Sequence, residues 1–278
     1  TEPSHAFTCV QAVGSHSAIG KRHNMEDDEI MIDQFCGVPT QGYFGLYDGH
    51  GGRATVDFVV KALHMNLEQY LKRNPTTDLF SAFKYSYLTT DGQLRRQSIL
   101  RSGSTSVTCV IREVDGKRML VSANVGDSRA VLCRGTQAIR LTIDHKASLP
   151  EEAKRIRDAG GFIGRNKRVN GVLAISRALG DHMLKNCGGG LNDVVSAEPY
   201  CAETELTSED SYVLMACDGV WDVLSDQEAM DFILAKVTVY EEQVKEAKRK
   251  GIPINGDLPT TPTNSNSESK SEDNGTSS

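Results

Sequence analysis

The sequence has no long apolar segment, and its longest uninterrupted apolar run, Tyr212 to Cys217, is six residues. A membrane-spanning helix needs about twenty such residues, so no membrane span is predicted. The seven cysteines are odd in number and include no Cys-x-x-Cys pair, and no signal-peptide pattern opens the chain. A disulfide framework is thereby excluded, and we expect reduced thiols in a cytoplasmic or nuclear setting.

Basic residues are outnumbered by acidic ones. Lysine and arginine together number 31 against 37 aspartates and glutamates, which gives a formal net charge of -6. The sequence shows no basic stripe, so nucleic acid is excluded as the main partner. The two basic stretches at 154–157 and 165–168 are predicted to be solvated surface.

The composition is otherwise that of one folded domain followed by a polar tail. With 38% hydrophobic residues and no linker rich in Pro, Gly or Ser between 7 and 240, the chain can bury one sizeable core. We place this domain at residues 1–254. Residues 255–278 contain Leu258 as their one aliphatic side chain, so this tail is predicted to be disordered.

Helical and extended patterns are mixed along the chain. Apolar spacing and helix stop signals predict helices at 51–72, 78–98, 150–160 and 226–251. Three extended stretches rich in Val, Thr and Cys lie between the second and third of these helices. We expect them, at 104–111, 119–125 and 129–133, to form one antiparallel meander.

Two apolar runs end in the same dipeptide. One leads into Asp48-Gly49 and the other into Asp218-Gly219, and each is typical of a buried strand with a carboxylate at its tip. A third acidic group, Glu26 to Glu29, lies upstream. Neighbouring carboxylates repel one another unless a positive group lies among them. Because oxygen ligands favour Mg²⁺ or Mn²⁺ over Zn²⁺, these segments predict a site for a hard divalent cation.

Several longer motifs occur in a fixed order along the chain. They are Arg22-x-x-Met25-Glu26-Asp27, Asp48-Gly49-His50-Gly51-Gly52, Ser102-Gly103-Ser104-Thr105, Val125-Gly126-Asp127-Ser128-Arg129, Asp144-His145-Lys146, Arg168-Val169-Asn170-Gly171, Ser176-Arg177-Ala178-Leu179-Gly180-Asp181 and Cys217-Asp218-Gly219-x-Trp221-Asp222. With them the chain resembles the metal-dependent (type 2C, PPM) Ser/Thr protein phosphatases over roughly residues 14–236. The resemblance implies an α+β fold, a central β-sandwich of two mostly antiparallel sheets flanked by antiparallel helices in four α-β-β-α layers. It also implies a flap within residues 144–192.

The resemblance further implies hydrolysis of phosphoserine and phosphothreonine in proteins by a water that two Mg²⁺ or Mn²⁺ ions activate. Asp48 would bridge the two ions, and the carbonyl of Gly49 would bind one of them directly or through water. Asp218 would bind the first of the two ions and Glu26 would bind the second. Asp127, together with Asp218, would hold a weaker third ion. Phosphorylated proteins are then the expected partners of a monomeric enzyme.

The same resemblance implies the other catalytic roles. Asp27 would orient a water of the metal centre. Arg22 would hold the substrate phosphate, because a guanidinium group offers two parallel charge-assisted hydrogen bonds. His50 would donate a proton to the leaving alkoxide. We interpret Ser104-Thr105 and the segment 168–171 as structural supports.

Each of these residues has an ordinary interpretation when it is taken alone. Asp-Gly is common in turns, His50 alone is typical of a loop, and Arg22 alone is typical of a surface ion pair. Their joint occurrence in family order reverses that interpretation. The histidines without paired metal spacing are taken as ordinary residues, namely His5, His16, His23, His64 and His182. A cysteine-based phosphatase is excluded, because none of the seven cysteines has an arginine six positions later, and Cys217 has Val223 there.

The sequence departs from the family pattern near its C-terminal end. The family supplies a further Asp ligand from a Ser-x-Asp-Asn segment that leads into an apolar strand, whereas Ile252–Ile254 follows the last predicted helix here. Asp273, Asp257 and a segment beyond Ser278 are the three candidates for that ligand. The departure leaves a second hypothesis open, a phosphatase-like module that binds phosphoproteins with weak or no turnover. The presence of His50 beside the carboxylates favours the enzyme.

Overall fold

The computed structural model describes residues 7–185 and 190–250 of the chain. They belong to two compact units, one up to Ile233 and one from Leu234 onward, and helix α5 (Asp226–Lys250) crosses that division. The predicted domain end at 254 and the tail 255–278, with the candidate ligands Asp257 and Asp273, lie outside the described residues.

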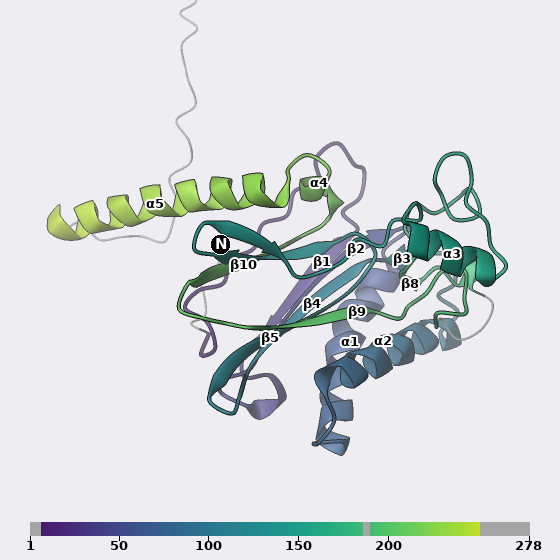
Figure 1. The fold of residues 1–278 in the computed structure, drawn as a ribbon, viewed down its shortest axis with the longest axis horizontal. Helices are drawn as coiled ribbons and strands as arrows, with labels where there is room; N and C mark the ends of the chain where they lie inside the picture. The colour runs from purple at the N-terminus through teal and green to yellow at the C-terminus, as the bar shows by residue number, and fades with distance from the viewer. Residues whose placement is uncertain (1–6, 186–189, 251–278) are drawn as a thin grey trace, which may run out of the picture. The chain divides into compact units, whose positions relative to one another are not determined.

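A seven-stranded antiparallel sheet runs through the first unit (Figure 1). Its strands are β1 (Asp27–Ile32), β2 (Gly42–His50), β3 (Gly103–Ser104), β4 (Ser106–Val114), β5 (Lys117–Val125), β8 (Leu179–Gly180) and β9 (Tyr200–Glu205). Their order is β8-β3-β2-β4-β5-β9, and β1 pairs with β2. Asp115 and Gly116 both have positive φ, which suits the tight turn that joins β4 to β5.

A second sheet has three antiparallel strands. In it β6 (Arg129–Arg134) lies between β10 (Asp210–Ala216) and β7 (Gln137–Arg140). The prediction that 129–133 continues the meander is therefore wrong. The edge of β5 that a third meander strand would use is taken by β9, and the chain turns out of the sheet at Gly126 (φ 86°). A side chain at Gly126 would meet Thr105 Cγ2 at 2.7 Å, so this turn depends on glycine.

Two apolar layers pack against the large sheet. The layer between the two sheets comprises mainly Val107, Cys109, Ile111, Leu120, Ala130, Leu132 and Leu141. The layer on the other face is covered by α1 (Ala54–Arg73) and α2 (Leu79–Arg96), and it includes the fully buried Tyr43, Tyr47 and Tyr87. Figure 1 shows these two helices next to each other against the sheet. Removal of these side chains from water is the main driving force for this packing.

The ends of α1 and α2 follow local sequence signals. Helix α1 ends at Arg73, one residue before Asn74-Pro75, because a residue that precedes proline disfavours the helical conformation. Helix α2 begins after Asp78, whose carboxylate accepts a hydrogen bond from the Ser81 N–H at 2.9 Å. That contact satisfies one of the free N–H groups of the first turn.

The flap, residues 144–192, contains α3 (Pro150–Asp158), β8 and the 3₁₀ turn η2 (His182–Leu184). Its own buried cluster comprises Ala147, Ile156, Val169, Ile175 and Ala178 and continues beyond it to Val194 and Val195. The Glu152 side chain is 7% exposed and binds Arg177 at 2.6 Å and Arg155 at 3.0 Å. The prediction that 154–157 is solvated surface is thus wrong for Arg155, which helps to compensate a buried carboxylate. The stretch 165–168 is exposed, as predicted.

The remaining short elements are the 3₁₀ turn η1 (Phe35–Gly37) and helix α4 (Asp218–Trp221). Two antiparallel sheets with flanking helices confirm the expected α+β sandwich. None of the helices in the described part of the chain is both long enough and apolar enough to span a membrane.

Candidate metal centre and active site

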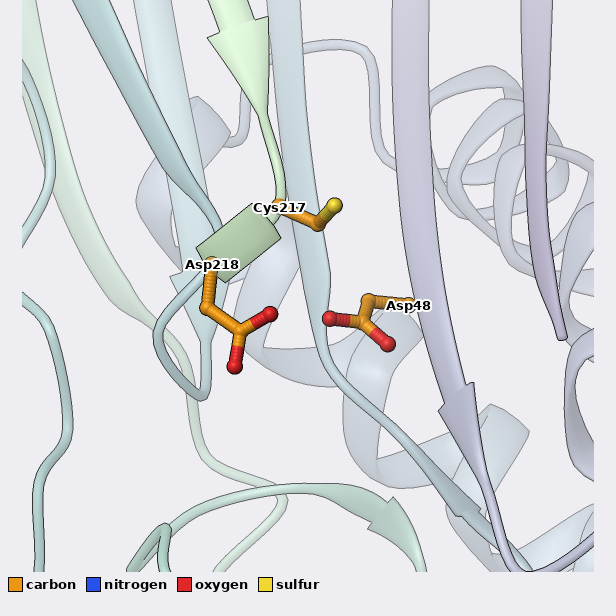
Figure 2. Close-up of side chains that lie close together, drawn as sticks. All are labelled: Asp48, Cys217 and Asp218. Carbon is orange, nitrogen blue, oxygen red and sulfur yellow. The ribbon is translucent and has the colours of Figure 1, made fainter. Parts of the chain in front are cut away.

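The two Asp-Gly segments come together in space. Asp48 lies near the end of β2, and Asp218 is the first residue of α4, which only Cys217 separates from the end of β10. One possible ligand atom from each of Asp48, Cys217 and Asp218 lies within 4.8 Å of the others. Figure 2 shows the two carboxylates facing each other, with the Cys217 sulfur beside them. The convergence predicted for these two strand ends is present.

The electrostatics of this cluster favour a cation. Burial, followed by the charges of Asp27, Asp218 and Asp127, raises the pKa of Asp48 to about 7. Burial and the charge of Asp127 also raise the pKa of Asp218, although Lys146 and Arg22 act against this. A divalent ion would remove this repulsion, so the residues fit such an ion.

The thiol of Cys217 is a poor ligand in this setting. Burial, and then the charge of Asp27, raise its pKa to about 12. Its Sγ lies 3.5 Å from Asp27 Oδ2, as a weak hydrogen-bond donor. Because metals bind the thiolate rather than the thiol, the donor set at neutral pH consists of oxygens, which suits Mg²⁺ or Mn²⁺.

Strand β1 brings the upstream acidic group to the same end of the sheet. Asp27 is the register partner of Asp48, and the Gly49 N–H donates to the Glu26 carbonyl at 3.1 Å. A Cβ on Gly49 would lie 2.5 Å from that carbonyl oxygen and 2.6 Å from Val56 Cγ2. The close approach of Glu26 therefore requires glycine at position 49. The Glu26 carboxylate itself is not part of the three-residue group that contains Asp48 and Asp218.

Two further residues, Arg53 and Thr105, hold in place the strands that carry the carboxylates. Arg53 donates to the carbonyls of Met25 and Asp27, at 2.9 and 3.0 Å, and binds Asp28 at 2.6 Å. Thr105 Oγ1 accepts a hydrogen bond from the Asp48 N–H at 3.2 Å, and the Thr105 N–H donates to the Asp48 carbonyl at 2.9 Å. The contacts of Thr105 agree with its interpretation as a support. The contribution of Arg53 was not predicted, and its position directly after the Asp-Gly-His-Gly-Gly motif was the available signal.

Asp127 is buried and already has a positive partner. The Nζ of Lys146 lies 2.7 Å from Asp127 Oδ2 and 3.7 Å from Asp222 Oδ1. The Asp127 side chain is 8% exposed. The carboxylate expected to hold a weak third ion is thus paired with an ammonium group, and any additional ion would have to compete with that group.

His50 lies at the end of β2, two residues after Asp48. Its Nε2 is 2.8 Å from Asp181 Oδ2. Burial lowers the pKa of His50, but the hydrogen bond to Asp181 and the charges of Asp181, Asp48 and Glu26 outweigh this, so the pKa is above its ordinary value. The raised pKa favours the protonated form of the imidazole, which is the form that a proton donor needs.

Arg22 is exposed, in a turn where its N–H donates to the Ile19 carbonyl at 3.1 Å. Its charge acts to lower the pKa of Asp218. The predicted phosphate-binding residue is therefore exposed, and it lies near enough to Asp218 for its charge to act on that carboxylate.

Comparisons with known proteins agree with this geometry. The family model described as Protein phosphatase 2C matches residues 11–253. "Protein phosphatase 2C homolog 1" of Saccharomyces cerevisiae is 37% identical over 225 residues, which are 76% of this chain and 77% of that protein. "Probable protein phosphatase 2C 59" of Oryza sativa is 39% identical over 247 residues, 86% of this chain and 71% of that protein. The crystal structure of serine-threonine phosphatase 2C from Toxoplasma gondii shares the fold, with a TM-score of 0.66 and 21% identity over 84% of this chain and 88% of that one.

The chain therefore belongs to the protein phosphatase 2C family. Its activity is that of a protein Ser/Thr phosphatase, and the family depends on Mg²⁺ or Mn²⁺. The expected family, fold and reaction are confirmed. The roles of single residues and the number of ions stay predictions.

Proposed function

We propose that Asp48, Asp218, Glu26 and the Gly49 carbonyl hold two Mg²⁺ or Mn²⁺ ions that serve the hydrolysis of phosphoserine and phosphothreonine in proteins. The observation that carries this is the facing pair Asp48 and Asp218, whose pKa values are both raised because like charges are buried together. When bound, such ions neutralise the phosphoryl oxygens and make water a better nucleophile at neutral pH.

The protein's own side chains complete the chemistry. Arg22 binds two phosphate oxygens of the substrate and aligns the phosphorus with the carboxylate cluster. Asp27, the register partner of Asp48, accepts a hydrogen bond from the attacking water and orients it. His50 gives a proton to the leaving oxygen of the serine or threonine, which is a poor leaving group without one. Lys146 forms an ion pair with Asp127, while Asp48 and Asp218 are left to hold the ions.

The test is hydrolysis of a phosphothreonine peptide by the full chain, with Mn²⁺ and with a chelator in its place. We expect turnover that requires Mn²⁺ and that Asp48→Asn reduces by more than about 10³-fold, since a carboxylate that would hold the ions is lost. Asp210→Asn is the matched control, because Asp210 is a buried, ion-paired carboxylate at the start of β10, away from Asp218. Binding of the peptide without Mn²⁺-dependent turnover would instead support the phosphoprotein-binding module.

A further inference from the structure

A buried carboxylate that the roles above do not use lies against His50. Asp181 Oδ2 is 2.8 Å from His50 Nε2, and the Asp181 side chain is 7% exposed. We propose that Asp181 is the positioning residue of the general acid, which fixes the His50 ring so that Nδ1 presents a proton to the leaving oxygen. This inference rests on the proposed function of His50.

Three neighbouring strands, the long β2 and the two-residue β3 and β8, set the contact. His50 ends β2 and pairs with Gly103 of β3, and Gly103 pairs in turn with Gly180 of β8. Asp181 follows Gly180 directly, so its side chain meets His50 across β3. A Cβ on Gly103 would overlap both the Asp181 carboxylate and the His50 ring. The absence of a side chain at position 103 is therefore what lets the two groups meet.

The backbone at Asp181 is held in an uncommon conformation. Its φ is 52°, in the left-handed region, and its N–H donates to the Ser102 carbonyl at 3.0 Å. Non-glycine residues stay in this region where the surroundings impose it, and they are frequent at functional sites.

The buried ion pair between Asp91 and Lys185 helps to hold the backbone in this conformation. Asp91 Oδ1 accepts hydrogen bonds from the Gly180 N–H at 2.8 Å and from Lys185 Nζ at 2.6 Å. The Lys185 side chain is 0% exposed, and it also donates to the Ala178 carbonyl at 2.8 Å. Helix α2, which carries Asp91, therefore anchors the residue that precedes Asp181. The position of the carboxylate is thus set by the fold rather than by His50 alone.

The contact decides which ring nitrogen faces the substrate. A carboxylate only accepts, so it takes the Nε2–H of His50 and leaves the second proton of the imidazolium on Nδ1. As the water oxygen bonds to phosphorus, the bond from phosphorus to the leaving oxygen breaks and the Nδ1 proton moves to that oxygen. His50 keeps its Nε2–H, and it regains a proton that the attacking water releases. Asp181 takes no part in the proton transfer and only orients the ring.

The experiment compares two substrates with different leaving groups in the full chain with Mn²⁺. A phosphothreonine peptide has an alkoxide leaving group that needs a proton, whereas p-nitrophenyl phosphate releases a stable phenolate. For Asp181→Asn we expect kcat on the peptide to fall on the order of 10²-fold and kcat on p-nitrophenyl phosphate to change by less than about threefold. Asparagine tolerates the left-handed conformation at this position. Asp181→Gly, which has no side-chain strain there, is the second variant and should show the same split.

Three controls separate this inference from the others. The double variant Asp181→Asn with His50→Gln should be no slower on the peptide than His50→Gln alone, because the two side chains act as one unit. Mn²⁺ affinity, measured by calorimetry, should be unchanged in Asp181→Asn. Asp210→Asn, which removes the negative charge of a side chain that is 5% exposed and bound to Arg134, should leave both rates unchanged.

Equal losses on both substrates, or additive losses in the double variant, would overturn the positioning role of Asp181 and leave the phosphatase activity standing. Absence of any Mn²⁺-dependent hydrolysis by the unmodified protein would instead overturn the proposed function. The two failures are therefore distinguishable.

Discussion

At the scale of single residues, the site consists of charges that the protein does not fully balance. Asp48 and Asp218 lie close together and half-buried, and both pKa values are raised. Lys146 and Arg22 act in the opposite direction on Asp218. Part of the negative charge of the two carboxylates is therefore left uncompensated, and it can attract a cation. If side chains compensated this charge fully, an ion would gain little by binding.

His50 is predicted to act on the chemical step and not on metal binding. His50→Gln should lower kcat on a phosphothreonine peptide by about 10²- to 10³-fold, because the alkoxide then leaves without a proton. The Kd for Mn²⁺ should stay within about threefold, since the imidazole is not among the oxygen donors. Stopped-flow kinetics and titration calorimetry measure the two quantities, and equal losses in both would indicate a structural role.

Lys146 is predicted to compete with an additional ion at Asp127. Lys146→Met removes the ammonium group 2.7 Å from Asp127 Oδ2. A weak Mn²⁺ site should then bind about tenfold more tightly, which corresponds to about 1.4 kcal/mol. Titration calorimetry would measure this, with Lys154→Met as the control, because Lys154 forms an exposed pair with Asp158 on α3. Unchanged or weaker binding in Lys146→Met would contradict the competition.

The residues at the site differ in how far the sequence predicts them. Asp48 and Asp218 could be predicted from the sequence. Each follows an apolar strand and precedes glycine, so its place at a strand end could be inferred. The contacts of Arg53 and Asp181 could not be predicted from the sequence, although both residues lie in or beside recognised motifs. Arg53 reaches β1 from the start of α1, and Asp181 reaches His50 across β3, so each contact depends on strand pairing that the sequence does not state.

At the scale of elements, the flap depends on one buried carboxylate. Glu152 accepts hydrogen bonds from Arg177, Arg155 and Ser176. Burial acts to raise the pKa of Glu152, but the two arginines outweigh this and lower the pKa to about 2. A carboxylate with a depressed pKa stabilises the folded state above its unfolded pKa, and that stabilisation is lost as the pH falls towards its folded pKa.

Glu152→Gln is therefore predicted to destabilise the flap by about 2–4 kcal/mol at pH 7, because both arginines lose their buried partner. The difference from the unmodified protein should shrink as the pH falls from about 4.5 towards about 2, where the native carboxyl group also takes up a proton. Amide hydrogen exchange in residues 145–178 would measure it. Glu151→Gln, at the exposed neighbouring position, is the control. Equal effects of the two variants would show that the contacts of Glu152 with the two arginines do not stabilise the flap.

The helices were predictable as elements, whereas one strand assignment was not. The apolar spacing and the Pro and Gly signals placed α1, α2, α3 and α5 close to their observed bounds. The three extended stretches were also found, but β6 belongs to the second sheet. A pattern of alternating side chains shows that a segment is a strand, and it does not show which strand is its neighbour.

At the scale of the whole molecule, the metal centre is a source of instability that binding removes. The raised pKa of Asp48, about 7, means that ionising this group costs folding free energy in the metal-free protein. The direction of the pH dependence follows from proton linkage. Between about pH 4 and pH 7 the folded state binds more protons than the unfolded state, so the stability of the folded state falls as the pH rises through that range.

Metal-free Asp48→Asn is accordingly predicted to be more stable than the unmodified protein at pH 8, by about 1–3 kcal/mol after allowance for solvent screening. Mn²⁺ should raise the Tm of the unmodified protein and should have little effect on the variant. Thermal unfolding with Mn²⁺ and with chelator measures both, with Asp158→Asn as an exposed control. Lower stability of the metal-free variant would contradict the repulsion inferred here.

The central claim, that distant acidic segments converge to hold divalent ions, is tested most directly by an anomalous-scattering map of crystals soaked in Mn²⁺. We expect a peak at about 2.1 Å from carboxylate oxygens of both Asp48 and Asp218, and a second peak that shares Asp48 with Glu26. Peaks elsewhere with none at Asp48, in protein that hydrolyses phosphothreonine only when Mn²⁺ is present, would contradict the claim.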